Sequence, residues 1–387
     1  DFAVKEEVYL TELLKELREK SYRPLPVERV TIPKPGGGER KLGIPTIRDR
    51  VVQQALLDIL QPIFEEDFHP SSYGYRPGRS CHQAISKATM FIRKYDRKWV
   101  VDMDLSKCFD TLDHELIIQT FRKRVVDGSI LKLLGAFLKS GVMTKDGREA
   151  TEVGSPQGGV ISPLIANVYL NEFDQLMMSR GHRIVRYADD ILILCSSQSG
   201  AENAGKVAEK YLEGELKLTV NQKKTHLIHA KEGVKFLGVT IRTNYTQIQR
   251  EKVCLFKDKV KRITRRSSPV NLEKVIKDLN PVLRGFGNYF RIANCKSEFR
   301  GLAQWIRRRL RAKQLSLWKR PKRLHRRLRQ LGHHGDFDAI KMRSWRNAAS
   351  PLANMALPNN YLMEPGLFDL TGIKTGILVR DPRGNQA

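Results

Sequence analysis

The chain has 387 residues, 41% of them hydrophobic and 29% charged, an ordinary composition for a globular protein with two or three domains. No apolar run approaches the length of a membrane span and no signal-peptide pattern opens the chain, so we expect no membrane partner. The formal net charge is +27, and 25 Lys and Arg against 5 Asp and Glu lie between Glu251 and Gln330. Basic charge concentrated in this way indicates binding to a phosphate backbone.

Five cysteines are scattered without a Cys-x-x-Cys pair, which is typical of reduced cysteines in a cytoplasmic protein. The chain begins with Asp rather than Met, so we expect a further segment upstream.

The first elements are a helix and a hairpin. Residues 6–20 have a helical apolar stripe, and two β-favouring segments, 27–34 and 39–45, flank a Pro-Gly-Gly-Gly turn. The turn lacks the Gly-Lys-Ser/Thr of a phosphate-binding loop, so its glycines only reverse the chain. Lys34 and Arg40 place basic groups beside it.

A helix is predicted over residues 49–64, and a loop at 72–80 precedes another helix that Ser80 caps and that runs to residue 95. The loop mixes aromatic and basic side chains, which can stack on bases and contact phosphates. Those side chains are Tyr75, Arg76 and Arg79.

Residues 99–105 read as a strand whose alternation places Asp102 and Asp104 together on one face. Helices are predicted over 113–126 and 129–139. A Gly-rich loop then leads to a helix, with Ser162 as its cap, that ends near residue 179.

The segment from Ile184 to Leu194 reads as a β-hairpin with Asp189 and Asp190 at its tip. Two adjacent anions between apolar strands need a cationic partner, and a divalent metal suits their hard oxygen ligands. A solvated Asp-Asp turn is the alternative.

A helix over 201–215 and short strands at 218–221 and 235–241 follow. Beyond residue 253 the chain predicts long basic amphipathic helices, best defined over 270–290 and 296–317. Their arginines are candidate phosphate contacts: Arg284, Arg307, Arg308, Arg309 and Arg311.

Three carboxylates, a basic hairpin and a basic helical region suit nucleotide polymerisation. That chemistry needs two divalent ions, one to activate the attacking 3′-hydroxyl and one to stabilise the leaving pyrophosphate. Carboxylates on adjacent strands can bridge both ions, and Lys34 and Arg40 can neutralise a triphosphate.

The chain resembles the reverse transcriptases of group II introns, in seven sequence boxes that follow the family's order between residues 22 and 371. The boxes are Ile32–Pro35 with Leu42–Pro45, Tyr75–Ser80, Asp104–Asp110, Ser155–Gly159 with Ser162–Leu164, Tyr187–Asp190, Phe236–Gly238, and Leu279–Pro281 with Gly287–Phe290.

The resemblance implies an α+β right-hand polymerase fold of fingers, palm and thumb, with an antiparallel palm sheet and a basic helical thumb. We expect fingers over 1–98 and a palm with inserted helices over 99–250. A thumb that doubles as a maturase-type RNA-binding region is expected over 251–330, with an extension over 331–387.

The resemblance also assigns the metal site. Asp104, Asp189 and Asp190 are implied as catalytic ligands of two Mg²⁺ ions, which Mn²⁺ can replace, with the Leu105 carbonyl as a further ligand. Asp190 is implied as the more replaceable ligand, and Asp102 as secondary because the family motif begins at Asp104.

Nucleotide contacts are implied for Phe109, as the steric gate against a 2′-hydroxyl, for Gln157 beside the incoming nucleotide, and for Lys34 and Arg40 on the triphosphate. Tyr187 is implied to lie near the primer end.

The implied partners are an RNA template, a DNA or RNA primer, deoxynucleoside triphosphates and group II intron RNA. We expect a monomer or homodimer in a bacterial cytoplasm, assisting splicing and retrohoming. The family's template-capping segment is short or missing here and no Cys/His nuclease cluster follows, so we expect no cleavage of a DNA target.

Three alternatives remain: a freestanding relative that copies DNA or RNA ends in repair, a non-catalytic splicing maturase, and an RNA-dependent RNA polymerase. Intact Asp104, Asp189 and Asp190 argue against the pure binder, and the gate at Phe109 argues against the RNA polymerase.

Overall fold

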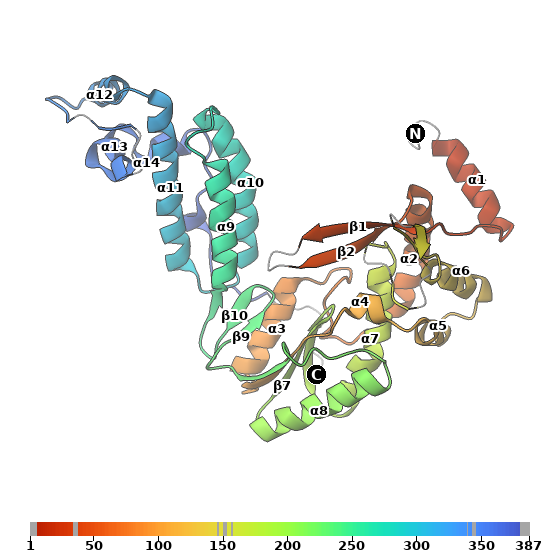
Figure 1. The fold of residues 1–387 in the computed structure, drawn as a ribbon. Coiled ribbons are helices and arrows are strands. Elements are labelled where there is room, and N and C mark those ends of the chain that lie inside the picture. Colours follow the sequence, from red (N-terminus) through yellow and green to blue (C-terminus); the bar gives the residue numbers. More distant parts are fainter. Residues whose placement is uncertain are drawn as a thin grey trace. The chain divides into compact units, whose positions relative to one another are not determined.

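The computed structural model describes residues 6–33, 38–144, 147–149, 153–155, 158–338, 340–342 and 346–379 (Figure 1). The described residues up to Val234 form one compact unit, and Lys235–Val379 form a second.

The first unit contains a four-stranded antiparallel sheet with strand order β6-β7-β3-β8. Its strands are β3 (Trp99–Met103), β6 (Arg183–Tyr187), β7 (Asp190–Cys195) and β8 (His226–His229). This confirms the antiparallel sheet expected for a palm, although β8 was not predicted. The predicted strand at 218–221 is wrong, because the described chain there makes a single bridge between Leu105 and Val220.

Alternation along the strands decides which face of this sheet is buried in the larger core. Val101, Met103 and Leu105 belong to the same apolar core as Ile191 and Ile193. Each fully buried side chain of this size stabilises the fold by about 1.5–3 kcal/mol. The face that carries Asp102 is therefore kept apart from this core, as the alternation predicted.

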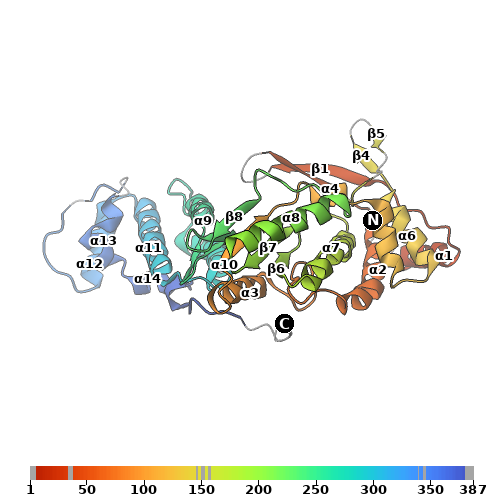
Figure 2. The same ribbon diagram turned by 90° about the horizontal axis from the view of Figure 1, so that it is seen from below.

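Two long helices cover the sheet, α7 (Ser162–Ser179) and α8 (Gln198–Gly214), and they lie side by side along it (Figure 2). Gly205 of α8 lies close to β3, since a Cβ there would be 3.6 Å from Val101 Cγ2. The predicted cap of α7 is wrong. The N-cap residue is Ile161, and the Ser162 hydroxyl instead bonds to Ser155 Oγ at 2.7 Å.

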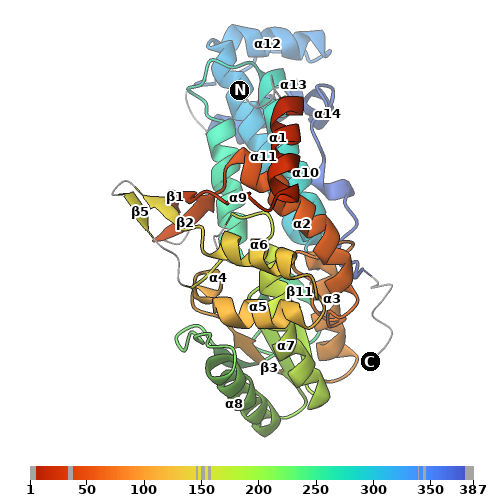
Figure 3. The ribbon, with the colours of Figure 1, turned by 90° about the vertical axis from the view of Figure 1, so that its right-hand side faces the viewer.

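The other helices of this unit are α1 (Glu6–Arg18), α2 (Ile47–Glu65), α3 (Cys81–Arg93), α4 (Cys108–Thr111), α5 (His114–Arg122) and α6 (Gly128–Leu138). Ser80 caps α3 as predicted, in a capping box with Gln83. Helix α3 packs on β6 and β7. Helix α5 packs against both α6 and α7 (Figure 3).

A second sheet has the strand order β2-β1-β4-β5. Its strands are β1 (Val27–Pro33), β2 (Glu39–Ile44), β4 (Val142–Thr144) and β5 (Gly147–Glu149). The predicted hairpin is confirmed by the antiparallel pairing of β1 with β2, in which Arg40 lies opposite Ile32. The parallel pairing of β1 with β4 was not predicted. Lys34 lies outside the described residues.

The second unit begins with a small sheet of β9 (Val234–Phe236), β10 (Val239–Ile241) and β11 (Thr246–Ile248). One strand was predicted over 235–241. The structure divides it at Leu237 and Gly238, whose φ angles of 46° and 81° turn the chain.

Helices make up most of the rest of this unit: α9 (Arg250–Ile263), α10 (Leu272–Phe290), α11 (Lys296–Trp318), α12 (Pro321–Gln330), α13 (Pro351–Ala356) and α14 (Asn359–Met363), with short 3-10 turns at Arg346–Ala349 and Leu370–Gly372. Helices α9, α10 and α11 run alongside one another (Figure 1). Stacked rings of Phe256 and Phe286, with centroids 4.0 Å apart, join α9 to α10. No helix among the described residues is long and apolar enough to cross a membrane.

Candidate active site

The β6–β7 hairpin carries two of the predicted catalytic carboxylates at its turn. Tyr187 lies opposite Asp190, so Ala188 and Asp189 form the two-residue turn. Ala188 has a φ of 58°, in the left-handed region that a residue with a side chain rarely adopts. The predicted placement of both acids at the hairpin tip is confirmed.

Asp104 is the first residue beyond β3, because the strand ends at Met103, two residues before the predicted end at Leu105. Three side chains from a single segment bind it. Asn221 Nδ2 donates to Asp104 Oδ2 at 3.0 Å, Lys224 Nζ lies 3.3 Å from the same oxygen, and Thr225 Oγ1 accepts from the Asp104 amide at 3.3 Å. The sequence reasoning missed these residues. Their signal was a polar run, from Asn221 to Thr225, directly after an apolar segment.

The carboxylates influence one another's ionisation. Part of Asp190 is exposed. Desolvation of its carboxyl, followed by the charges of Asp189 and Asp104, raises the pKa of Asp190 to about 6. Asp102 is half-buried, and burial followed by the charges of Asp190 and Asp104 raises its pKa to about 7. Four acidic side chains therefore share one region of negative potential.

The donor set fits divalent cations, although the side chains are not arranged around one here. Among the described residues, no three Asp, Glu, His or Cys side chains converge tightly enough to hold a metal ion. One Asp104 oxygen instead contacts Asn221 and Lys224. A nearby cation stabilises a carboxylate whose pKa is raised by burial and by neighbouring acids, as that of Asp190 is, and all-oxygen ligands suit Mg²⁺. Asp104, Asp189 and Asp190 remain the predicted ligands.

Aromatic and basic groups of the predicted nucleotide pocket lie near these acids. The rings of Phe109, on α4, and Tyr75 meet edge to face with centroids 6.4 Å apart. Burial raises the pKa of Tyr75, Asp189 adds to the rise, and Arg40 opposes it. The structure therefore brings Arg40, Tyr75 and Phe109 into the neighbourhood of the β6–β7 hairpin.

The Gly-rich loop at 154–162 lies against the same pocket. The Ser155 amide donates to Phe109 O at 2.7 Å. Gly158, with a φ of 122°, packs so closely on β2 that a Cβ would lie 2.6 Å from Gly43 O. Gln157 lies outside the described residues, between these two anchored positions.

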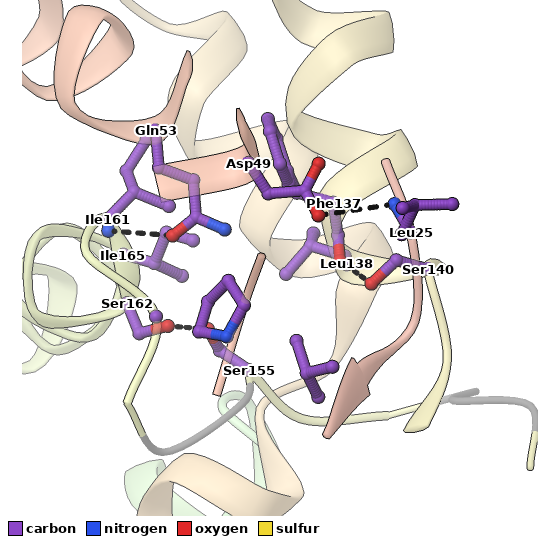
Figure 4. A pocket seen from close by; sticks show the side chains of 13 residues that line it. Leu25, Asp49, Gln53, Phe137, Leu138, Ser140, Ser155, Ile161, Ser162 and Ile165 are labelled. Atoms are coloured by element: carbon purple, nitrogen blue, oxygen red, sulfur yellow. Dashed lines mark hydrogen bonds between the residues drawn. The ribbon is translucent and has the colours of Figure 1, made fainter. Parts of the chain in front are cut away.

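Behind this loop is a small cavity (Figure 4). Gln53 Oε1, from α2, accepts from the Val160 amide at 2.7 Å and holds the loop from within. Asp49 is buried in the cavity wall, where Tyr22 Oη, Thr46 Oγ1 and the Leu25 amide donate to its carboxylate. The sequence reasoning treated residues 49–64 only as a helix. Nothing in the sequence marks the partners of Asp49, of which Tyr22 is 27 positions away, or the Val160 partner of Gln53, which is 107 positions away.

Arg76 was predicted to contact nucleic acid, and that prediction is wrong. Its side chain is buried, forms an ion pair with Glu65 at 2.7 Å and donates to the carbonyls of His69 and Ser72. It holds the loop together. Tyr75 is 53% exposed and remains a candidate contact. Arg79, half-buried beside the Tyr73 ring, and half-buried Tyr187 remain predictions as well.

Arg311 is a second correction, since its buried guanidinium donates to Leu357 O and Asn359 Oδ1. Arg309 Nε donates to Thr264 Oγ1 at 2.6 Å. Three arginines remain phosphate-contact predictions with more accessible side chains: exposed Arg284 and Arg308, and half-buried Arg307, 4.0 Å from Asp369.

Comparison with known proteins identifies the two regions. The family described as reverse transcriptase (RNA-dependent DNA polymerase) matches residues 32–241, and the maturase-specific domain of group II introns matches residues 254–332.

Curated relatives agree. The chain is 38% identical over 268 residues to the protein YkfC of Escherichia coli, a match that covers 60% of this chain and 70% of YkfC. It is 28% identical over 300 residues to the group II intron-encoded protein LtrA of Lactococcus lactis, covering 60% of this chain and 49% of LtrA. A putative COX1/OXI3 intron 2 protein of Saccharomyces cerevisiae is 28% identical over 292 residues, and 34% of its length is covered. The chain belongs to the reverse transcriptase family and carries a group II intron maturase-specific domain.

Proposed function

We propose that this protein is an RNA-directed DNA polymerase that adds deoxynucleotides to a primer 3′-hydroxyl at the β6–β7 hairpin. The observation that carries the proposal is the grouping of Asp104, Asp189 and Asp190 within one region of negative potential. That grouping lies inside the segment that matches the reverse transcriptase family.

Reverse transcriptases use divalent metal ions, and we propose two Mg²⁺ ions, replaceable by Mn²⁺, on Asp104, Asp189 and Asp190. When bound, the ions favour ionisation of the 3′-hydroxyl and stabilise the leaving pyrophosphate. The Leu105 carbonyl is proposed as a further ligand. We assign Arg40 and Lys34 the neutralisation of triphosphate charge. We also assign Phe109 the exclusion of the 2′-hydroxyl, and Gln157 a contact with the incoming nucleotide.

We assign RNA binding and splicing assistance to the second unit. The maturase-specific match covers α9 to α12, and its charge is strongly basic. LtrA is, by name, encoded by a group II intron, which favours an intron RNA partner here over a freestanding repair role. The five thiols are all free, in keeping with a reducing cytoplasm.

Primer extension tests the polymerase proposal. With an RNA template, a DNA primer, deoxynucleotides and Mg²⁺, the wild-type protein should extend the primer, and Asp189→Ala should abolish extension. Asp58→Ala changes an exposed acid on α2 and should leave extension intact. Normal extension by Asp189→Ala would refute the assignment of the site.

The intron assignment has a separate test. Affinity for a folded group II intron RNA should exceed affinity for a scrambled RNA of equal length at the same salt concentration, because phosphate contacts alone do not discriminate sequence or shape. Equal affinities would instead favour the freestanding polymerase.

A further inference from the structure

A fully buried ion pair lies directly beneath the catalytic hairpin. Arg186, one residue before Tyr187, and Asp174 of α7 are both 0% exposed. Arg186 Nε lies 2.9 Å from both carboxylate oxygens, and Nη2 lies 2.6 Å from one of them. Neither residue belongs to the metal or nucleotide set described above.

The third guanidinium nitrogen points away from the carboxylate. Arg186 Nη1 donates to Ala188 O at 3.0 Å and to Asn167 Oδ1 at 3.1 Å. Ala188 is the left-handed turn residue immediately before Asp189. The arginine therefore bonds the turn itself, at the carbonyl next to a catalytic acid.

Asn167 extends this network to a second segment, because its Nδ2 donates to Gly74 O at 2.7 Å. Gly74 packs on the turn so closely that a Cβ would lie 2.3 Å from the Ala188 amide nitrogen. Backbone bonds from Tyr73 to Arg186 O and from Arg186 to Ser71 O fix the same loop to β6.

Stability alone does not explain these residues. A buried ion pair is often no more stabilising than apolar side chains of the same volume, because both charges lose their hydration. Apolar side chains, however, cannot donate to the Ala188 carbonyl. A left-handed alanine is unfavourable by about 1–2 kcal/mol, so the turn persists only if its surroundings hold it.

We propose that Arg186 is a positioning residue for the polymerase reaction, oriented by Asp174 and Asn167, and that it holds Asp189 and the Tyr75 loop in one fixed relation. This inference rests on the proposed function. In this role Arg186, Asp174 and Asn167 do not contact the substrate. They act on the reaction through the backbone of the turn.

Three variants distinguish a positioning role of this network from a role in folding alone. Arg186→Lys keeps the charge for Asp174 but lacks the fork needed to reach Ala188 O as well. Asn167→Asp keeps an acceptor for Arg186 and loses the donor to Gly74 O. The double change Arg186→Met with Asp174→Leu removes both charges while retaining apolar volume. The control is Tyr169→Phe, which removes a buried bond from α7 to Leu216 O that does not involve the hairpin.

Two measurements are compared: kcat and KM in primer extension, and amide hydrogen exchange of peptides spanning residues 184–194. In all three test variants we expect kcat to fall on the order of 100-fold with little change in KM, because misplaced catalytic groups slow chemistry more than binding. Hairpin exchange should become faster. In Tyr169→Phe both should stay at wild-type values, even if its unfolding midpoint falls.

The proposal is overturned if Arg186→Lys and Asn167→Asp keep wild-type kcat and hairpin exchange, or if the double variant regains wild-type kcat. If Arg186→Lys does not fold, Asn167→Asp and the double variant decide the result. An inactive wild-type protein would refute the polymerase function, while the exchange measurement would still test whether the network holds the hairpin.

Discussion

Phe109 is the side chain on which we expect selection between deoxynucleotides and ribonucleotides to depend. Its half-buried ring is braced edge-on by Tyr75 and lies beside the loop at 154–162. Phe109→Ala should open space under the sugar and lower the preference for deoxynucleotides over ribonucleotides by about tenfold or more. The measurement is the ratio of kcat/KM for the two nucleotides. Phe109→Tyr keeps the ring and should retain the preference. Unchanged selection in the alanine variant would remove the gate assignment.

His69 makes stability depend on pH. It is buried, its Nδ1 accepts from the Ser71 amide at 3.0 Å, and burial lowers its pKa. The unfolded chain therefore binds a proton below about pH 6.5 that the native protein does not bind until lower pH. Stability should fall with decreasing pH in that window, by up to about 1.4 kcal/mol per pH unit from this residue.

Urea unfolding between pH 5 and pH 8 measures this dependence. His69→Gln should flatten the part of the slope that lies below pH 6.5, because glutamine does not titrate. A slope identical to that of the wild-type protein would show that His69 is not responsible.

Residue type alone could not separate the arginines of this chain. Arg76 and Arg308 look alike in the sequence, but Arg76 is neutralised internally by Glu65 whereas Arg308 is exposed. The position of Asp189 and Asp190 at the hairpin tip was predictable, because the two acids separate two apolar, β-favouring runs. Asn221 and Lys224, which contact Asp104, were not predictable, because each lies more than a hundred positions away from it.

At the scale of elements, the loop at 154–162 depends on α2. Gln53→Leu removes the acceptor for the Val160 amide and should loosen the loop that carries Gln157. We expect a several-fold rise in the KM for deoxynucleotides, with primer–template affinity unchanged. Gln175→Leu is the matched control, because it loses a bond to Asp67 O elsewhere in the same unit. Equal effects of the two substitutions would contradict the prediction.

Long elements were predictable from periodicity, and short ones were not. Helix α10, predicted over 270–290, has a strong apolar stripe, and the structure forms it over Leu272–Phe290. Strands β4 and β5 have three residues each and exist because they pair with neighbours. Such segments carry too few alternating positions to be recognised, so tertiary pairing decides their structure.

At the scale of the whole molecule, the concentration of basic charge should govern affinity for nucleic acid. Arg308→Gln removes an exposed charge and should reduce the slope of log affinity against log salt by about 0.9 if the residue contacts a duplex phosphate. Arg311→Gln should leave the slope unchanged and instead lower stability, because the Arg311 guanidinium donates a hydrogen bond to Leu357 O. Fluorescence anisotropy across a salt series checks both. Equal slopes for Arg308→Gln and the wild-type protein would place Arg308 outside the interface.

The distribution of charge along the sequence predicts a boundary between two regions of the chain, because the basic excess begins near Glu251. The structure places the boundary earlier, after Val234, since β9 to β11 group with the helices that follow. Charge predicts which part should bind phosphate but does not show which small strands pack with that part.

The strand order β6-β7-β3-β8 has a consequence during synthesis on the ribosome. Strand β3 pairs with β7 and with β8, whose residues emerge about 90 to 130 positions later. At roughly 5–20 residues per second, β3 waits several seconds or longer for both neighbours. Throughout that interval the apolar strand that leads to Asp104 has two unpaired edges, which leaves it open to aggregation and to chaperone binding.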